Sequence, residues 1–201
     1  MLTTTQTDIE KKAELFKDRE ELLRQLQTIV ERADYIRACK KASRFPFNYT
    51  AHYKSARGNR YTLILTATDK RKGSTNPLIS IYTTLDAREG KYMLRYDPVL
   101  QHVNIFTPHF FKRYRERALK QPTALADEII ATFAVRNFNT AQNRNKMLQT
   151  CSEGYIPTKK IDNGVDVCLT FISFDMLRDE QMEDAEKLLE IIKRHEKDCE
   201  L

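Results

Sequence analysis

The sequence predicts an α+β fold in which an antiparallel sheet, made of a meander and a late hairpin, is surrounded by helices, with a long helix near each terminus. Apolar residues recur every three or four positions near both ends of the chain, which is typical of helices. In between, they alternate with polar residues over several short stretches, which is typical of strands. Because short connections join most consecutive strands, we expect these strands to be antiparallel.

Length and composition are those of a soluble globular protein. A chain of 201 residues with 41% hydrophobic residues can bury a substantial core. No stretch approaches the roughly 18 apolar residues of a membrane span, and the first residues lack the pattern of a signal peptide. The four cysteines are far apart and form no CxxC pair, so we expect reduced thiols. These observations predict a cytoplasmic protein with no membrane partner.

Residues 1–44 are expected to form a helical segment, with one long helix from Thr7 to about Lys40, that packs on a domain formed by residues 45–201. Thr7 and Glu10 have the spacing of a capping box. The apolar stripe that follows consists of Ile9, Ala13, Phe16, Leu23, Leu26, Val30, Ala33 and Ile36. Four of these residues are heptad-spaced, so a homodimer or a contact with another protein through this helix is an alternative to packing on the domain.

Strands are expected from residue 47 onward. The predicted segments are residues 47–53, 61–67, 78–85, 91–96 and 101–106, followed by a late hairpin of residues 155–161 and 165–173. Asn163-Gly164 in the late hairpin predicts a type I′ turn. In its second strand Val165, Val167, Leu169 and Phe171 are expected on one face.

Three further segments complete the predicted fold. A helix is expected over residues 123–137, with Ala126, Ile129, Ile130, Phe133 and Ala134 on its inner face. A polar loop is expected over residues 137–146. An acidic helix is expected from Asp175 to about Lys197.

A predicted helix that begins at Thr107 carries more polar side chains suited to catalysis or binding than any other segment. Thr107 can act as N-cap, and Pro108 suits the first helical position. At about 100° per residue, one arc holds the apolar residues Phe110, Phe111, Tyr114 and Ala118. The opposite side holds His109, Arg113, Glu116 and Lys120, with Arg117 beside them.

These polar residues could cleave RNA without a metal. The helix N-terminus would favour the neutral form of His109, which suits a general base. Arg113 and Lys120 could stabilise a phosphorane, while Glu116 fixes their positions, and the 2′-hydroxyl would be the nucleophile. The alternative is a solvated helix face on which Arg113 and Glu116 form an ordinary i,i+3 pair.

Charge distribution favours nucleic acid as a partner. Residues 45–173 carry 19 Lys/Arg against 10 Asp/Glu, whereas residues 174–201 are acidic. Besides Arg117 and Lys120, the residues expected to hold phosphates are Arg57, Arg60, Arg144 and Lys146. The alternative is a solvated surface with a positive bias.

No metal or cofactor is expected. The four histidines show no HxxxH or HExxH spacing, and His102 is expected to be a packed or surface histidine. With only 5 glycines, none clustered, the chain has no phosphate-binding loop of the P-loop or Rossmann type.

The strand that runs into Thr-Pro-His109-x-x-x-Arg113-x-x-x-Arg117, with a second helix and a late hairpin after it, resembles the core of RelE-like and related small toxin ribonucleases. The resemblance covers residues 100–173 and implies that His109, Arg113 and Arg117 lie at or near an RNA site. The chain departs from those families in its length. Its last predicted strand offers Asp166 and Thr170, but no His, Arg or Tyr.

Three hypotheses about function follow. The first is a basic cytoplasmic protein that binds nucleic acid, with RNA as the expected partner and with metal-independent ribonuclease activity as a further step. The second is a non-enzymatic accessory protein that contacts protein partners through its terminal helices. The third is a small-molecule enzyme, whose sign would be a deep apolar cavity away from the basic face.

Overall fold

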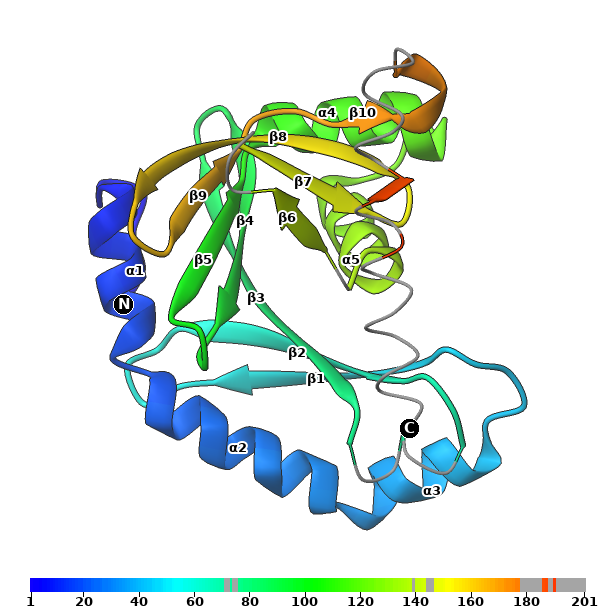
Figure 1. Cartoon of the computed structure of the whole chain (residues 1–201). Coiled ribbons are helices and arrows are strands. Elements are labelled where there is room, and N and C mark those ends of the chain that lie inside the picture. Colours follow the sequence, from blue (N-terminus) through cyan, green and yellow to red (C-terminus); the bar gives the residue numbers. More distant parts are fainter. Residues whose placement is uncertain are drawn as a thin grey trace.

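A computed structural model describes residues 1–70, 73, 76–138, 140–143, 147–177, 186, 187 and 190 of the chain. The predicted class is confirmed, because helices surround a mostly antiparallel sheet (Figure 1). Most of the predicted final helix, from Asp175 to Lys197, lies outside the described residues. Its first residues belong to a 3-10 turn, Phe174–Met176.

The sheet has 10 strands in the order β1-β2-β3-β4-β5-β9-β8-β7-β6, and β10 pairs with β8. The first five strands are β1 (Phe47–Lys54), β2 (Arg60–Ala67), β3 (Leu78–Ala87), β4 (Gly90–Asp97) and β5 (His102–Phe106). The later strands are β6 (Ala141–Asn143), β7 (Leu148–Cys151), β8 (Gly154–Asp162), β9 (Val165–Cys168) and β10 (Ile172–Ser173). Among these pairings, that of β5 with β9 is parallel and the others are antiparallel.

Strand β3 pairs with two neighbours over different parts of its length. Its first half, from Leu78 to Tyr82, pairs with β2. Its second half, from Tyr82 to Ala87, pairs with β4, and the last two residues of β4, Tyr96 and Asp97, pair only with β5. The sheet therefore divides at Tyr82, where β3 changes its partner from β2 to β4. Figure 1 shows β1 and β2 running in a different direction from β4 and β5.

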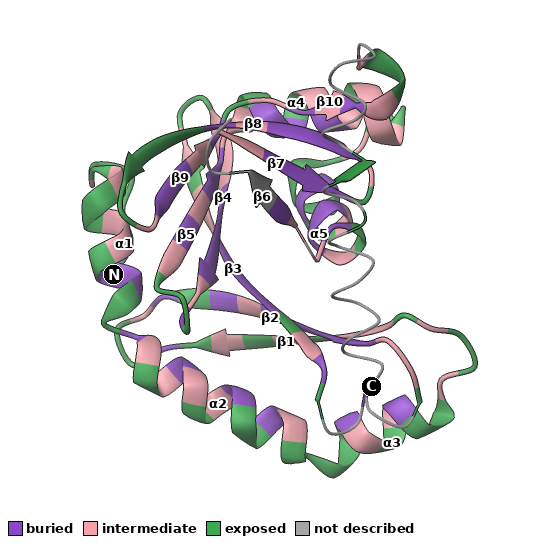
Figure 2. Cartoon of the chain, in the orientation of Figure 1, coloured by how far each residue is buried: buried purple, intermediate pink, exposed green. Residues whose placement is uncertain are grey.

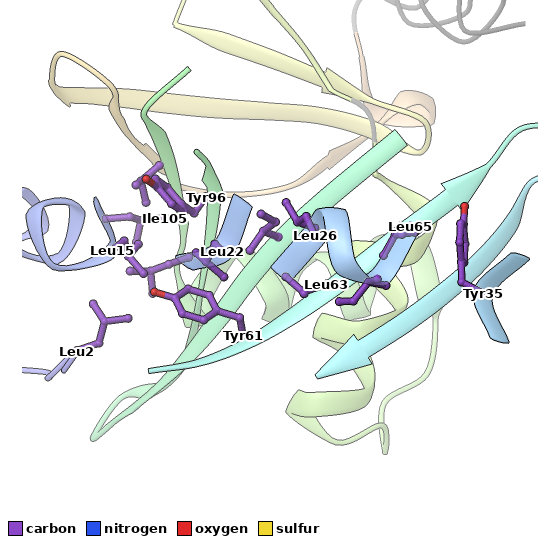
Figure 3. Close-up of a cluster of buried hydrophobic side chains, with 14 of the residues drawn as sticks. Leu2, Leu15, Leu22, Leu26, Tyr35, Tyr61, Leu63, Leu65, Tyr96 and Ile105 are labelled. Atoms are coloured by element: carbon purple, nitrogen blue, oxygen red, sulfur yellow. The ribbon is translucent and has the colours of Figure 1, made fainter. Parts of the chain in front are cut away.

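Two hydrophobic cores lie on opposite faces of the sheet. Helices α1 (Asp8–Phe16), α2 (Arg19–Glu31) and α3 (Ala33–Lys41) cover the first core, in which Leu15, Leu22 and Leu26 pack against Leu63 and Ile105 (Figure 3). Helix α4 (Pro108–Tyr114), the π-helix Arg115–Leu119 and α5 (Ala126–Arg136) cover the second core. Along these helices and strands, buried residues recur among intermediate and exposed ones (Figure 2).

The single long helix predicted for residues 7–40 is wrong, because three helices occupy this segment. The capping box of Thr7 and Glu10 is confirmed at the start of α1. The first break falls at Asp18, whose buried carboxylate accepts hydrogen bonds from Asn59 Nδ2 (2.7 Å) and Tyr61 OH (2.8 Å). These partners lie more than 40 residues away in the chain, so the pattern of apolar residues within the helix could not show the break.

The breaks change which residues face the core. Leu15, Leu22, Leu26 and Ile29 are buried, whereas Ile9 and Phe16 of the predicted stripe are 49% and 41% exposed. Ala13 and Ala33 are exposed as well. The helices pack on the sheet of their own chain, and a homodimer or another protein contact through this segment stays a prediction.

The late hairpin differs from the prediction in two respects. Of its two turn residues, only Gly164 has a positive φ, of 78°, whereas a type I′ turn requires a positive φ at Asn163 too. Beside this turn, the pairing of β8 with β9 has a register shift between Lys160 and Asp162. Strand β9 also ends at Cys168, so Leu169 is 42% exposed and Phe171 enters the second core instead of joining the face of Val165.

The region after α5 contains two strands that the sequence patterns did not indicate. The inner residues predicted for this helix, Ile129, Ile130, Phe133 and Ala134, are buried, but Ala126 is exposed. Part of the predicted loop over residues 137–146 forms β6, and β7 follows it. Strand β7 brings Gln149 over the sheet, where its amide donates to Asn104.

Glu14 anchors α1 to the turn between β1 and β2. Its carboxylate is buried and accepts hydrogen bonds from Arg57 Nε (3.0 Å) and Nη2 (3.1 Å) and from the α-amino group of Met1. Arg57, followed by the α-amino group, lowers the pKa of Glu14 from 4.5 to about 2. Because the folded pKa lies below the unfolded one, this stabilisation is present above pH 4.5 and is lost as the pH falls toward 2.

We expect the free energy of unfolding of the wild type to fall by about 1–3 kcal/mol more than that of Glu14→Gln between about pH 5 and pH 2. The lower end applies if solvent around the partly exposed Arg57 weakens the pair. Urea unfolding at each pH measures the difference. Glu116→Gln, which removes a carboxylate from an exposed ion pair, is the matched control and should behave as the wild type. The same pH dependence in Glu14→Gln and the wild type would contradict the anchoring role.

Candidate functional site

Helix α4 forms as its sequence predicts. The hydroxyl of Thr107 accepts a hydrogen bond from the backbone N–H of Phe110 (3.1 Å), and Pro108 occupies the first turn. Phe110, Phe111 and Tyr114 are buried in the second core. The cap and the apolar arc therefore depend on local signals that the sequence carries.

The polar face of α4 contains one exposed ion pair and an exposed histidine. His109 is exposed, and within the described part of the chain it has no hydrogen-bond partner. Arg113 Nη1 donates to Glu116 Oε2 (2.9 Å), and the two side chains are 38% and 39% exposed. Arg113 is the largest cause of the lowered pKa of Glu116. This is the i,i+3 surface pair that the alternative interpretation of the motif predicts.

A π-helix changes where the later residues of the motif point. The backbone N–H of Lys120 donates to the carbonyl of Arg115 (2.9 Å), an i to i+5 bond, so a spacing of about 100° per residue does not hold here. Arg117 donates from Nη1 to the backbone carbonyl of Phe171, which ties the helix to the segment before β10. Lys120 is exposed and has a left-handed φ of 54°.

The other predicted phosphate-binding residues do not join this helix. Arg57 is used at α1, where it binds Glu14, and Arg60 is exposed on β2. Figure 1 places the turn between β1 and β2 well apart from α4. Arg144 and Lys146 lie outside the described residues.

A cavity of about 600 Å³ lies at the split in the sheet, between the first half of β3 and the end of β4. Most of its wall is apolar and comes from Leu23, Leu26, Leu78, Ile79, Ile81, Pro98, Val99, Leu100 and Phe138. Its polar residues include Ser80, Arg95, His102, Asn104 and Gln149. Such a volume and such a lining are typical of small-molecule sites, which span about 300–1,000 Å³.

Arg95 is the unusual residue of this cavity. It is only 9% exposed, and its Nε and Nη2 have no hydrogen-bond partner among the described residues. Its guanidinium carbon lies 5.3 Å from the ring centre of Phe106 and 5.4 Å from that of Phe133. Burial lowers its pKa from 12.5 to about 10, so it remains charged at neutral pH. Among the described residues, no carboxylate lies within ion-pair distance of it.

Polar side chains continue from Arg95 across the neighbouring strands. The register places Arg95 of β4 opposite Asn104 of β5, and Asn104 opposite Asp166 of β9. Gln149 Nε2 donates to Asn104 Oδ1 (2.6 Å), whereas Gln149 Oε1, which is also buried, has no partner in the described part of the chain. His102 Nε2 lies 3.1 Å from Asp166 Oδ2. The polar part of the cavity lining therefore includes a cation and an amide oxygen that lack partners among the described residues.

A second cavity, of about 390 Å³, adjoins the first at Leu100 and His102. It is lined by Lys12, Lys160 and Asp166, among others. Lys12 Nζ donates to the backbone carbonyl of Asn163, and Lys160 Nζ donates to Asn163 Oδ1 (3.2 Å). Since both ammonium groups have partners, this cavity lacks the unpaired buried cation of the first one.

One local signal for Arg95 exists in the sequence. In Tyr92-Met93-Leu94-Arg95-Tyr96 a cation interrupts an otherwise apolar strand segment, on the same face as the buried Met93. A charged residue at an inward position of a strand is a candidate for function. The pairing of His102 with Asp166 had no such signal, since it depends on the parallel ladder between β5 and β9.

The described part of the chain holds no group of three or more His, Cys, Asp or Glu side chains that could bind a metal ion. Its described cysteines, Cys39, Cys151 and Cys168, are free and buried. None of the described helices combines the length and the apolar character that crossing a bilayer requires. Comparisons with protein-family models, with curated proteins and with solved structures find no match to this chain.

Proposed function

We propose that this protein binds a small anionic molecule in the cavity between β3 and β4, with Arg95 as the charge partner of the ligand. The observation that carries this proposal is the unpaired guanidinium in the wall of a cavity of about 600 Å³. The mostly apolar lining of this cavity also agrees with the third functional hypothesis, a small-molecule site.

Arg95 is costly to the fold if nothing binds to it. Moving a cation from water into a protein interior costs several kcal/mol, and a carboxylate or phosphate partner normally offsets that cost. The contacts with Phe106 and Phe133 offset only part of it, because cation–π interactions contribute about 0.5–2 kcal/mol. A bound anion would supply the missing charge partner.

Replacing Arg95 by methionine removes the charge and keeps an unbranched apolar side chain. Because an unpaired buried charge is destabilising, we expect Arg95→Met to raise the free energy of unfolding, without ligand, by about 1–3 kcal/mol in urea unfolding. The control Arg113→Met breaks an exposed pair and should change it by about 0.5 kcal/mol or less. A loss of stability in Arg95→Met would show that the ring contacts outweigh the cost of burial and would remove the main support for a ligand.

A ligand that binds the folded protein raises its melting temperature, because it stabilises the folded state by an amount that grows with the logarithm of the ligand concentration relative to Kd. We expect at least one compound from a panel of small carboxylates and phosphate esters to raise the melting temperature of the wild type but not that of Arg95→Met. Neutral amides and alcohols of the same shape are the matched controls. Absence of a shift with every anion, or equal shifts in the two proteins, would contradict an anion site at Arg95.

The second candidate function is RNA binding at α4, with metal-independent cleavage as a further step. It is favoured by His109, Lys112 and Lys120, which are exposed and form no ion pair with a described carboxylate. These groups are accessible to a phosphodiester backbone, as RNA binding requires. Because Arg113 pairs with Glu116, this face has fewer unpaired cations than the sequence motif predicted.

Cleavage of a labelled single-stranded RNA in EDTA tests this second candidate. If it holds, the wild type cuts the RNA and His109→Ala, prepared identically, does not. Equal cutting by the two proteins would place the activity elsewhere or in a contaminant. If neither cuts, the ribonuclease hypothesis is wrong, and the salt dependence of RNA retention then decides on binding: contacts with several phosphates weaken steeply with salt, whereas the apolar helix contacts of an accessory protein do not.

A further inference from the structure

We infer that the ligand of the Arg95 cavity is a monocarboxylic acid with an extended apolar body, held with its carboxylate at Arg95 and its body along α2 and β3. This inference rests on the proposed anion site and names the class of ligand that the site would take. Three features of the cavity carry it: the number of charges at the polar end, the hydrogen-bonding groups beside them, and the apolar wall.

The charges at the polar end match one negative charge. Arg95 is the one buried cation in the described lining of the cavity. The carboxylate of Asp97, which also lines the cavity, accepts hydrogen bonds from the backbone N–H groups of Val99 and Leu100, and Asp166 lies two strands from Arg95 in the same row, behind Asn104. Strands are spaced by about 4.8 Å, so the buried carboxylate of Asp166 stands roughly 10 Å from Arg95. A phosphate monoester brings a charge of about −1.5 to −2 at neutral pH, and its second charge would be uncompensated there. A carboxylate brings one charge, which the guanidinium neutralises with parallel hydrogen bonds.

The side-chain amide of Gln149 indicates that the ligand carries a hydrogen-bond donor near its carboxylate. Gln149 is 2% exposed, and its Oε1 has no partner, while its Nε2 is engaged by Asn104. Ser80 Oγ, also buried and also in the lining of the cavity, has no partner either. A hydroxyl or amine close to the acid group would satisfy Gln149, since a buried amide oxygen without a hydrogen bond is costly.

The rest of the cavity suits a hydrocarbon. Leu26 and Ile81 are 6% and 2% exposed and form the inner wall, whereas Ile79, Val99 and Leu100 are 46%, 70% and 74% exposed at its rim. Three large apolar side chains exposed beside one cavity would be covered by an apolar body that leads out of it. The polar groups lie at one end, so an amphipathic molecule has one favourable orientation.

The test measures binding to the full-length protein by isothermal titration calorimetry with four probes below their micelle concentrations: decanoate, decanol, decyl phosphate and acetate. We expect decanoate to bind most tightly, with decanol and decyl phosphate at least tenfold weaker and acetate too weak to detect. Shortening the acid by two carbons should weaken binding about tenfold, because each buried methylene contributes to affinity. A hydroxylated decanoate should bind more tightly than decanoate if Gln149 Oε1 receives a hydrogen bond.

Variants separate the two ends of the ligand. Arg95→Met should reduce binding of decanoate at least tenfold and leave that of decanol unchanged. Ile79→Gln, at the exposed rim, should weaken decanoate several-fold, whereas Ile9→Gln, at a similarly exposed apolar residue on α1, should not. Melting temperatures of these variants confirm that they are folded.

Distinct results would overturn distinct claims. Tighter binding of decyl phosphate than of decanoate, lost in Arg95→Met, would overturn the monocarboxylate and leave the anion site standing. Binding of acetate equal to that of decanoate would overturn the apolar body alone. Equal binding of decanol and decanoate, unchanged in Arg95→Met, would overturn this inference together with the proposed function. If none of the probes binds, the inference is wrong, and the panel of small anions alone decides on the site.

Discussion

The divergence of β3 from β4 is the constraint on which the rest of the structure depends. Strand β3 bonds to β2 up to Tyr82 and to β4 beyond it, so one strand holds together two parts of the sheet that point in different directions. In space, helix α2 lies beside β1 and β2, whereas α4 and α5 contact β4 (Figure 1). Where the two parts separate, none of the described strands lies between β3 and the end of β4, and the cavity beside Arg95 lies there.

Buried charge and surface charge play different parts in this molecule. Glu14 is buried but engaged by Arg57, so the fold gains from it, whereas Arg95 is buried and unpaired, so the fold gains little and binding could gain much. On α4 the cations are exposed, where the pair of Arg113 with Glu116 contributes little. The strongest electrostatic driving force for a ligand therefore lies between β3 and β4 and not on the basic helix.

The side chains of the motif that resembles RelE-like toxin ribonucleases do not share one regular helix face. The helix of the motif forms with the expected cap and core face. However, Arg117 donates a hydrogen bond to the backbone carbonyl of Phe171, and His109 is exposed without a hydrogen-bond partner among the described residues. The π-helix from Arg115 to Leu119 removes the regular spacing on which the predicted constellation depended. RNA cleavage thus remains a proposal supported by accessible cations.

The sequence by itself determined the features that depend on neighbouring residues. These are the caps at Thr7 and Thr107, the apolar arc of Phe110, Phe111 and Tyr114, and the alternation that marks the strands from β1 to β5. Only the tertiary structure decided the break at Asp18, the row of Arg95, Asn104 and Asp166, and the approach of His102 to Asp166. The reason is physical: caps and periodicity act within a few residues along the chain. Burial, ion pairing and the shape of a cavity instead depend on partners tens of residues away, which no local pattern records.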